Sequence, residues 1–381
     1  MKITKVETLR ASRFTWVKVH TDEGLHGIGE AHPASGTSGW PKAVYGGIEY
    51  CADYVVGKNP LEVEKHWQHM FRRQLFRGGS DIMSAMSAID QALWDIAGKA
   101  AGLSVSRMLG GPVRDRVKVY VHINGETPEA LADDARRRAD EGYKALRFYP
   151  LASLRQGMPD SYQGIVRTAV AFTKAVREAA GPDIDIMIDV VNRLSPPEAI
   201  AIGRALEEFG LYFFEDPIEP DNIEAMADVA RAMPVPVATG ERMYTLYQFR
   251  ELLARKGAAY IRPDPALAGG ISQIKKIAGL AEADYVGVVP HNPLSPVSTA
   301  VCAQLCAAIH NVPVQEYTGT EHEPQKRDLV NDVLEVEDGF LKIPDRPGIG
   351  IDLNIEAFKH HPPVPYERPI AYHPDGSLRE Y

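Results

Sequence analysis

The sequence predicts a β/α barrel preceded by a smaller α+β domain. Eight short apolar runs, starting near positions 117, 145, 185, 212, 236, 260, 286 and 313, alternate with amphipathic helical stretches. This alternation is typical of parallel strands joined by right-handed crossovers. Three consecutive runs end at equal spacing on acids, Asp189, Glu215 and Glu241, as expected at the carboxyl end of barrel strands. The 381 residues fit a barrel of about 250 residues and a second domain.

The first 116 residues have the mixed pattern of an α+β domain. The alternating runs FTWVKVHT and GLHGIGEA are separated by Asp22-Glu23-Gly24, which indicates a hairpin. A loop with Gly, Ser and Pro follows at 32–41 and is suited to a lid, where His32 and Trp40 could contact a substrate or lie on the surface. The stretch 80–101 has apolar residues at helical spacing, with Ser80 as the expected N-cap and Gly102 as the expected stop.

The region 117–320 carries the barrel pattern. Thr127-Pro128 and Ser195-Pro196 each combine a capping side chain with a proline at the first helical position, so each predicts a helix start. After about residue 320 the pattern breaks. The remaining segment, 321–381, is rich in Pro, His and Asp and includes one hairpin-like piece, VLEVEDGFLKI. We expect it to pack back on the first domain.

Composition excludes several classes of protein. The net charge of −9, without long runs of one sign, argues against a nucleic-acid-binding surface. No apolar run is long enough to cross a bilayer, and MKITKVETLR lacks an apolar signal region, so a cytoplasmic enzyme without membrane contact is expected. The three cysteines, Cys51, Cys302 and Cys306, have no metal-binding spacing and are interpreted as reduced core residues.

The equally spaced carboxylates predict a metal site. Three carboxylates that converge at strand ends repel one another unless a cation lies between them, so Asp189, Glu215 and Glu241 indicate a hard divalent ion. Mg²⁺ is favoured because it uses few carboxylates and leaves positions for substrate and water. Zinc is disfavoured because no nearby Cys or His pair supplies softer ligands. The alternative is that each acid pairs with an arginine or caps a helix.

Two later strand ends predict an acid–base pair. VGVVPHN carries His291 at the end of a strand, and YIRPDP carries Asp264 at the end of the strand before it, so their side chains can meet. The carboxylate would fix the tautomer of the imidazole and raise its basicity, giving a general base. The alternative is a structural histidine bonded to backbone. Glu316, on the last strand, could bond to a substrate oxygen or form a salt bridge with a barrel arginine.

These residues resemble the enolase superfamily, in the mandelate racemase-type subgroup of sugar-acid dehydratases. The helix SAIDQALWDIAGKAAG, the run ALAGGI and the segment EDGFLKIPDRPGIGID extend the resemblance over nearly the whole chain. It implies that residues 1–116 form a capping domain, completed by the segment 321–381, and that 117–320 form a modified (β/α)7β barrel with essential Mg²⁺. It also implies that a base takes the proton next to a carboxylate, giving an ene-diolate.

The resemblance also implies a substrate class. In dehydratases an acid helps the β-hydroxyl leave, and the product is a 2-keto-3-deoxy sugar acid. We therefore expect an aldonate such as galactonate, gluconate or mannonate, and a homo-oligomer between dimer and octamer.

The second barrel strand departs from the racemase pattern. It reads KALRFYP, with Arg147 and Tyr149 where racemases of the subgroup have a lysine. An arginine stays charged and cannot easily act as a base, so Arg147 is expected to bind the substrate carboxylate or stabilise the intermediate. Arg147 and His122 match mannonate and gluconate dehydratases. Tyr162 could be the counterpart of a loop tyrosine in the mannonate enzymes or an exposed residue.

The third strand lacks an expected histidine. Sugar-acid dehydratases commonly carry Asp-x-His there, whereas this chain has Val191 at the His position, followed by Asn192. Valine cannot move a proton, while Asn192 and Asn292 could bind hydroxyls. In a dehydratase, His291 could then act as base and later as acid, in a syn elimination. The alternatives are an epimerase, racemase or lactone cycloisomerase acting by α-proton abstraction, or a member with weak or no dehydratase activity.

Overall fold

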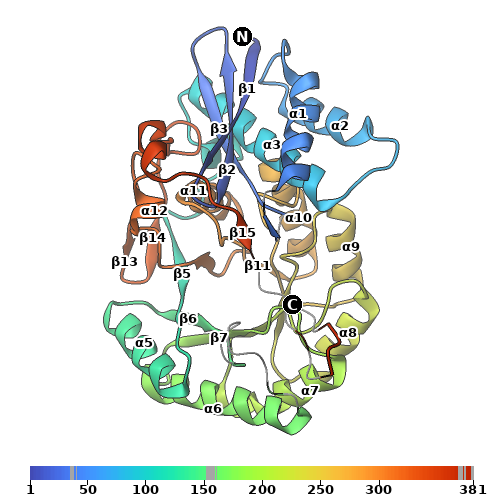
Figure 1. The fold of residues 1–381 in the computed structure, drawn as a ribbon, viewed down its shortest axis with the longest axis vertical. Coiled ribbons are helices and arrows are strands. Elements are labelled where there is room, and N and C mark those ends of the chain that lie inside the picture. Colours follow the sequence, from blue (N-terminus) through green and yellow to red (C-terminus); the bar gives the residue numbers. More distant parts are fainter. Residues whose placement is uncertain are drawn as a thin grey trace.

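The computed structural model describes residues 1–34, 38–39, 41–151, 159, 161–367, 372 and 375–378. Strands and helices of the first hundred residues form the upper part of Figure 1, and the green helices of the barrel form the lower part. Trp40, predicted on the lid, lies outside the described residues.

The N-terminal capping domain packs one antiparallel sheet against three helices. The sheet has the order β1 (Ile3–Ala11), β2 (Phe14–Thr21), β3 (His26–Ala31), and its β2–β3 hairpin confirms the predicted turn. The helices are α1 (Lys42–Val55), α2 (Val63–Arg72) and α3 (Ser80–Ala101). Gly27 and Gly29 let β3 approach α3 closely, because a Cβ at either position would overlap a backbone carbonyl of the helix.

Helix α3 ends as predicted but starts differently. Gly102 terminates it in the left-handed conformation, with φ of 67°. The prediction of Ser80 as N-cap is wrong, because Ser80 is the first helical residue and Gly79, with φ of 99°, takes the cap position. A glycine tolerates that φ without the steric cost a side chain would bring.

The barrel domain confirms the predicted fold class. Within the described residues, eight parallel strands alternate with seven helices, after a short link at α4 (Val105–Met108). The strands are β5 (Arg116–His122), β6 (Ala145–Phe148), β7 (Asp185–Asp189), β8 (Phe213–Glu215), β9 (Val237–Thr239), β10 (Tyr260–Ile261), β11 (Gly287–Val288) and β12 (Gln315–Tyr317). The helices are α5 (Pro128–Asp140), α6 (Tyr162–Ala180), α7 (Pro196–Ala205), α8 (Ile223–Ala232), α9 (Leu246–Ala254), α10 (Gly270–Ala283) and α11 (Pro296–Ala308).

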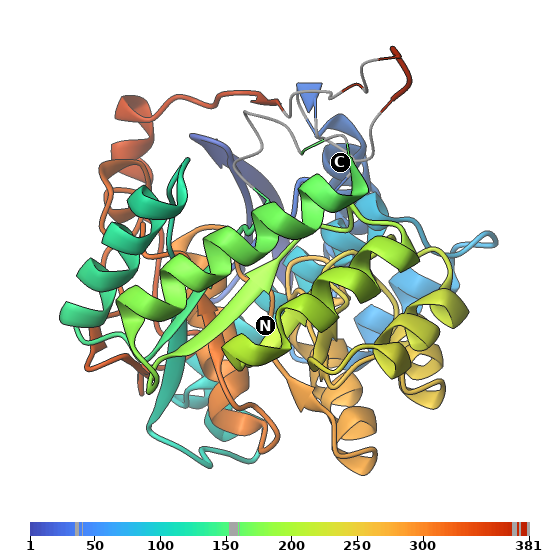
Figure 2. The same ribbon diagram turned by 90° about the horizontal axis from the view of Figure 1, so that it is seen from below.

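Pairing runs in sequence order from β5 to β11, and β12 pairs with β5 on its other side. Seen from below, the green and yellow helices lie on the outside of the molecule (Figure 2). Both predicted helix starts are confirmed. Thr127 accepts from Ala130 N at 3.2 Å, and Ser195 forms a capping box with Glu198.

Apolar side chains fill the interior of the barrel, so the polar site lies at one end of it. A cluster of buried residues on seven of the strands or beside them closes the interior: Tyr120, Ala145, Met187, Phe213, Ala238, Val289 and Val314. Because a barrel of this size is a packed core, polar chemistry is restricted to the carboxyl ends of the strands and the loops that follow them.

The C-terminal segment contacts both domains. It contains α12 (Pro324–Arg327), the hairpin β13 (Val336–Glu337) and β14 (Phe340–Lys342), a 3₁₀ turn at Ile355–His360, and β15 (Tyr366–Glu367), which pairs with β4 (Ser38–Gly39). Strand β14 pairs antiparallel with β5 of the barrel. On the capping side, the Phe358 ring lies 5.3 Å from that of Trp16. None of the described helices is long and apolar enough to cross a membrane.

Two carboxylates of the capping domain bind the start of barrel helices. Asp90, on α3, accepts from the backbone N of Ser272 at 3.0 Å and from its Oγ at 2.5 Å. Glu30, on β3, accepts from the Oγ of Ser295 at 2.5 Å and from the N of Ser298 at 3.1 Å. These contacts hold the loops after β10 and β11 against the capping domain.

Candidate active site

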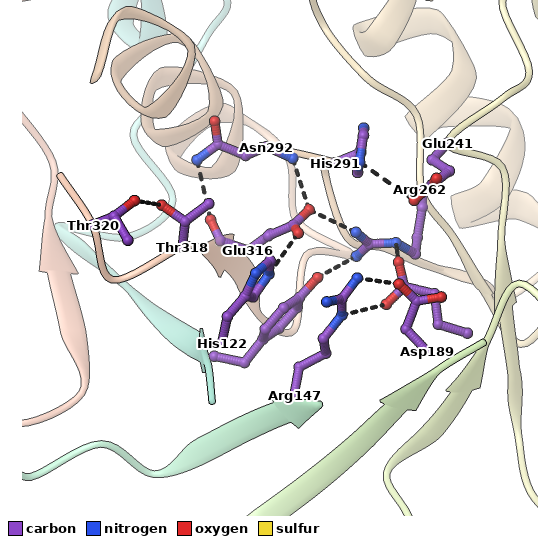
Figure 3. A network of polar contacts seen from close by, with 12 residues as sticks. His122, Arg147, Asp189, Glu241, Arg262, His291, Asn292, Glu316, Thr318 and Thr320 are labelled. Atoms are coloured by element: carbon purple, nitrogen blue, oxygen red, sulfur yellow. Dashed lines mark hydrogen bonds and ion pairs between the residues drawn. The ribbon is translucent and has the colours of Figure 1, made fainter. Parts of the chain in front are cut away.

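A buried histidine–aspartate pair lies at the carboxyl ends of β10 and β11. The Nδ1 of His291 lies 2.8 Å from Oδ2 of Asp264, and Oδ1 of Asp264 accepts from Ala266 N at 2.6 Å. A carboxylate bonded in this way keeps the proton of the imidazole on Nδ1. The Nε2 atom faces Glu241, at 3.3 Å from its Oε2. The structure therefore brings the predicted pair together. It also directs Nε2 of His291 toward Glu241 (Figure 3).

The surrounding carboxylates control the charge of His291. Burial alone would lower its pKa, but Glu241, Glu316 and the bond to Asp264 outweigh burial and raise the pKa to about 10. The same attraction, mainly from His291 and Arg262, holds the pKa of Glu241 below its usual value although burial opposes it. With these groups alone, the imidazole carries a proton at neutral pH.

Three acids form a compact cluster beside this pair. Glu215, Asp216 and Glu241 each offer an oxygen, and these oxygens lie within 4.8 Å of one another. Asp189 ends the neighbouring strand in register with Glu215, but its carboxylate is bound by the guanidinium of Arg147. The cluster thus includes two of the three predicted metal ligands together with Asp216, which the sequence analysis missed.

Electrostatics and hydrogen bonding indicate that a cation fits this cluster. Burial raises the pKa of Glu215 well above its usual value and that of Asp216 to about 7. Nε of Arg262 lies 2.5 Å from Oε1 of Glu215, yet neither Glu215 oxygen receives a well-directed hydrogen bond from the described residues. Closely spaced carboxylate oxygens with poorly satisfied lone pairs suit a hard divalent ion. The all-oxygen ligand set disfavours zinc.

Arg262 connects the carboxylate cluster to the last strand. Its side chain is fully buried, with Nη2 2.6 Å from Oε2 of Glu316 and Nη1 2.5 Å from the hydroxyl of Tyr120. Arg262 was not among the residues predicted from the sequence. One signal was available: it stands two residues before Asp264, and alternate residues of a strand point to the same side.

Glu316 lies in the middle of a polar network on the opposite side of the site. It accepts from His122 Nε2 at 2.8 Å, from Arg262, and from the backbone N of Asn292 at 2.7 Å (Figure 3). Burial would raise its pKa, but Arg262 and His291 hold the pKa well below the usual range. Burial lowers the pKa of His122 to about 4, so this imidazole is neutral. Glu316 thus forms the salt bridge with a barrel arginine that the sequence left as the alternative to a bond with a substrate oxygen. Its oxygens nevertheless remain part of the site.

Arg147 and Tyr149 lie beside the third and fourth strand ends. The guanidinium of Arg147 contacts Asp189 and lies 4.3 Å from the centre of the Tyr149 ring. Burial raises the pKa of Tyr149 to about 12, so its phenol stays neutral. Asp189 and Glu215 raise the pKa of Arg147 further, against the effect of burial. Arg147 is therefore a fixed positive charge, in agreement with its predicted inability to act as a base.

The amide side chains predicted to bind hydroxyls are held by protein groups. In its hydrogen-bonded orientation, the amide of Asn192 donates to Ile218 O at 2.7 Å and accepts from Arg242 Nε at 3.1 Å. The amide nitrogen of Asn292 donates to Thr299 Oγ1 at 2.9 Å, and the side chain is buried. Tyr162 is 44% exposed at the start of α6.

Val191 and Asn192 have unusual backbone conformations. Their φ angles are 55° and 60°, in the left-handed region that β-branched residues rarely adopt. The turn places Val191 N 2.7 Å from Oδ1 of Asp189. Strain of this kind persists where the surrounding structure enforces it, which is common at functional sites.

The sequence matches two family models over most of its length. Residues 2–110 match the mandelate racemase / muconate lactonizing enzyme N-terminal domain, and residues 130–357 match the enolase C-terminal domain-like family. The chain belongs to the enolase superfamily. Within it, the chain is 36% identical over its full length to the full-length D-galactonate dehydratases of Variovorax paradoxus and Xanthomonas campestris.

Solved structures of superfamily members have the same fold. An enolase from Agrobacterium radiobacter, bound to Na and L-malate, is 31% identical, with a TM-score of 0.91 over 99% of both chains. The 3,6-anhydro-D-galactonate cycloisomerase of Zobellia galactanivorans is 29% identical, with a TM-score of 0.84 over 95% of this chain and 99% of that one. Members with this fold therefore include enzymes of more than one reaction class.

Proposed function

We propose that the chain dehydrates a sugar acid, an aldonate such as galactonate, gluconate or mannonate, to a 2-keto-3-deoxy sugar acid. The observation that carries the proposal is the His291–Asp264 pair directed at a buried carboxylate cluster. The full-length similarity to proteins named D-galactonate dehydratase supports the reaction class. Galactonate is therefore the first compound to test.

The charged groups on the two sides of the site suit an anionic substrate. Arg147 is a permanent positive charge at the strand ends and would bind or orient the substrate carboxylate. Mg²⁺, held by Glu215 and Glu241 with Asp189 or Asp216, would stabilise charge developing on that carboxylate and offset the negative field at His291. Neutral His122 and ionised Glu316 would bind substrate hydroxyls, with Tyr149 nearby.

Proton transfer in this mechanism belongs to His291. Asp264 keeps the proton of the neutral ring on Nδ1, so Nε2 is the atom that takes the proton from the α-carbon. The resulting imidazolium is stabilised by Asp264 and Glu241. His291 would then return the proton to the departing β-hydroxyl, since Val191, two residues after Asp189, has no proton to donate.

The test is a screen of aldonates and aldarates with Mg²⁺ for 2-keto-3-deoxy product. We expect turnover of at least one compound, and its loss in His291→Asn. The matched control is His310→Asn, an exposed histidine just after α11, which should retain activity. A screen without product, or product formation unchanged in His291→Asn, would refute the proposal.

A second candidate is a cycloisomerase or epimerase. It is favoured by Val191 in place of an acid–base histidine, and by the structural similarity to the cycloisomerase of Zobellia galactanivorans. Such an enzyme would exchange the α-proton in D₂O and isomerise its substrate without loss of water. Mass spectrometry of the products separates it from the dehydratase.

The domain boundaries at residues 116 and 320, a homo-oligomeric state and a cytoplasmic location remain predictions of the sequence. Each follows from the resemblance or the composition. Sedimentation analysis of the purified protein tests the oligomeric state.

A further inference from the structure

The capping domain places a second histidine beside the catalytic pair. His32 follows strand β3, and its Nε2 lies 4.0 Å from Oδ2 of Asp264. Ring nitrogens of His32 and His291 lie within 4.8 Å of each other, and their ring centres are 6.2 Å apart. The side chain of His32 is 21% exposed, so it borders the site and remains accessible to a substrate.

Three hydrogen bonds fix the position and tautomer of His32. Its backbone N donates to Ala266 O at 3.2 Å, and its backbone O accepts from Ser84 Oγ at 2.6 Å. Its Nδ1 accepts from the backbone N of Ala34 at 2.9 Å. Because a backbone N–H can only donate, Nδ1 carries no proton. The ring is therefore neutral, with its proton on Nε2, the nitrogen that lies toward Asp264.

A dehydration at this site needs such a donor. The β-hydroxyl leaves as water only if its oxygen is stabilised while the C–O bond breaks and a proton reaches it. The side chain of Val191 has no polar atom, and its backbone N already donates to Asp189. His291 can supply the proton, since it holds the one removed from the α-carbon, but it cannot also hold the departing oxygen in place with a second N–H, because Nδ1 is bonded to Asp264.

We propose that His32 Nε2–H donates a hydrogen bond to the departing β-hydroxyl of the sugar acid and replaces the donor missing at position 191. The inference rests on the proposed dehydratase function. His291 takes the α-proton and delivers it to the hydroxyl oxygen, the C–O bond breaks, and water and the enol form. The enol then gains a proton at the β-carbon and loses one from its hydroxyl, which gives the 2-keto-3-deoxy acid. His32 remains neutral throughout.

The position of His32 also sets the stereochemistry of the elimination of water. Both imidazoles lie next to Asp264, so the base and the donor reach the substrate from the same side. Elimination is therefore syn.

The same geometry fits a metal ion bound by His32, Asp264 and His291 less well than it fits a hydrogen bond to a substrate. The three side chains have suitable donor atoms. However, both oxygens of Asp264 already accept hydrogen bonds, from Ala266 N and from His291 Nδ1. A hydrogen bond from His32 to a substrate leaves both of these bonds to Asp264 in place.

The test compares water loss with exchange of the α-proton in D₂O for His32→Ala, on the best substrate of the wild type. Removing a donor aimed at a leaving oxygen should slow water loss roughly 100-fold. Exchange depends on His291 and should persist, so the ratio of exchange to water loss rises. His32→Gln, which restores an N–H donor without an acid–base group, should recover part of the lost rate.

The control is His26→Ala, at the start of the strand β3 that precedes His32, because Nε2 of His26 lies 2.7 Å from Oδ2 of Asp352 outside the site. It should leave the ratio unchanged. Equal falls of exchange and water loss in His32→Ala, or no fall in either, would overturn the role of His32 while the dehydratase function stands. Exchange without water loss in the wild type, for every sugar acid tested, would overturn both proposals. Anti stereochemistry in the product would also overturn the role of His32.

Discussion

Arg262 is the residue on which the charge balance of the site depends. Its fully buried guanidinium lies 2.5 Å from an oxygen of Glu215 and 2.6 Å from an oxygen of Glu316. Both carboxylates are themselves buried. Removing one member of such a set leaves buried charges without compensation, which typically costs about 3–5 kcal/mol.

We therefore expect Arg262→Met to lower the free energy of unfolding by about 3–5 kcal/mol, measured by urea denaturation. The control is Arg107→Met. Arg107 forms a two-bonded pair with Asp345, but both side chains are largely exposed, so the loss should stay below about 1 kcal/mol. Equal losses in the two variants would show that burial does not govern the Arg262 network.

At the scale of elements, the capping domain holds the helices that follow β10 and β11. Glu30 binds the start of α11, and Asp90 the start of α10. Burial is the largest influence on both carboxyls and raises the pKa of each to about 7. In an unfolded chain such groups titrate near pH 4. The fold thus favours their protonated forms.

The sign of the pH dependence follows from these values. The stabilisation by each carboxyl is fully present below the unfolded pKa and is lost as the pH rises through about 7. We expect the free energy of unfolding to fall between about pH 5 and about pH 8, and the fall to be smaller in Glu30→Gln/Asp90→Asn, measured by urea unfolding. Asp133→Asn, at an exposed acid, is the control and should keep the wild-type slope. An unchanged slope in the double variant would contradict this account.

The sequence predicts the positions of strand ends better than the partners of their side chains. Asp264 and His291 were predictable because each closes an apolar run, and neighbouring parallel strands bring their ends together. Arg262 was missed because its partners Glu215, Tyr120 and Glu316 lie on strands that only barrel closure brings around it. Asp216 was missed because it directly follows Glu215, and consecutive residues of an extended strand point to opposite sides, whereas its φ of 45° departs from that pattern. His32 was predicted only as a lid residue that could contact a substrate, because its position beside Asp264 depends on the docking of β3 onto the loop after β10.

At the scale of the whole molecule, the capping domain and the barrel share an interface at the loops after β10 and β11. Three tryptophans of the capping domain donate across it: Trp16 to Ser295 Oγ, Trp67 to Gly269 O and Trp94 to Ser272 Oγ. The interface thus secures the loops after β10 and β11. A cation bound to the folded site should stabilise the whole assembly, since an unfolded chain offers no such cluster.

We expect Mg²⁺ to raise the free energy of unfolding by about 2.7 kcal/mol at a hundredfold excess over its Kd, seen as a higher Tm. Glu241→Gln removes one ligand and should abolish most of the shift. NaCl at matched ionic strength is the control for general screening. An equal Tm shift with NaCl would show general screening in place of a specific site, and an undiminished shift in Glu241→Gln would place Mg²⁺ elsewhere.

The central claim is that His291, held by Asp264, removes the proton next to the carboxylate of a sugar acid. Its most direct test is ¹H NMR of aldonates in D₂O with Mg²⁺ and enzyme, which follows the α-hydrogen and the product. We predict that the wild type replaces or removes the α-hydrogen of at least one aldonate, and that His291→Asn does neither. Loss of that hydrogen at the wild-type rate in His291→Asn would contradict the claim.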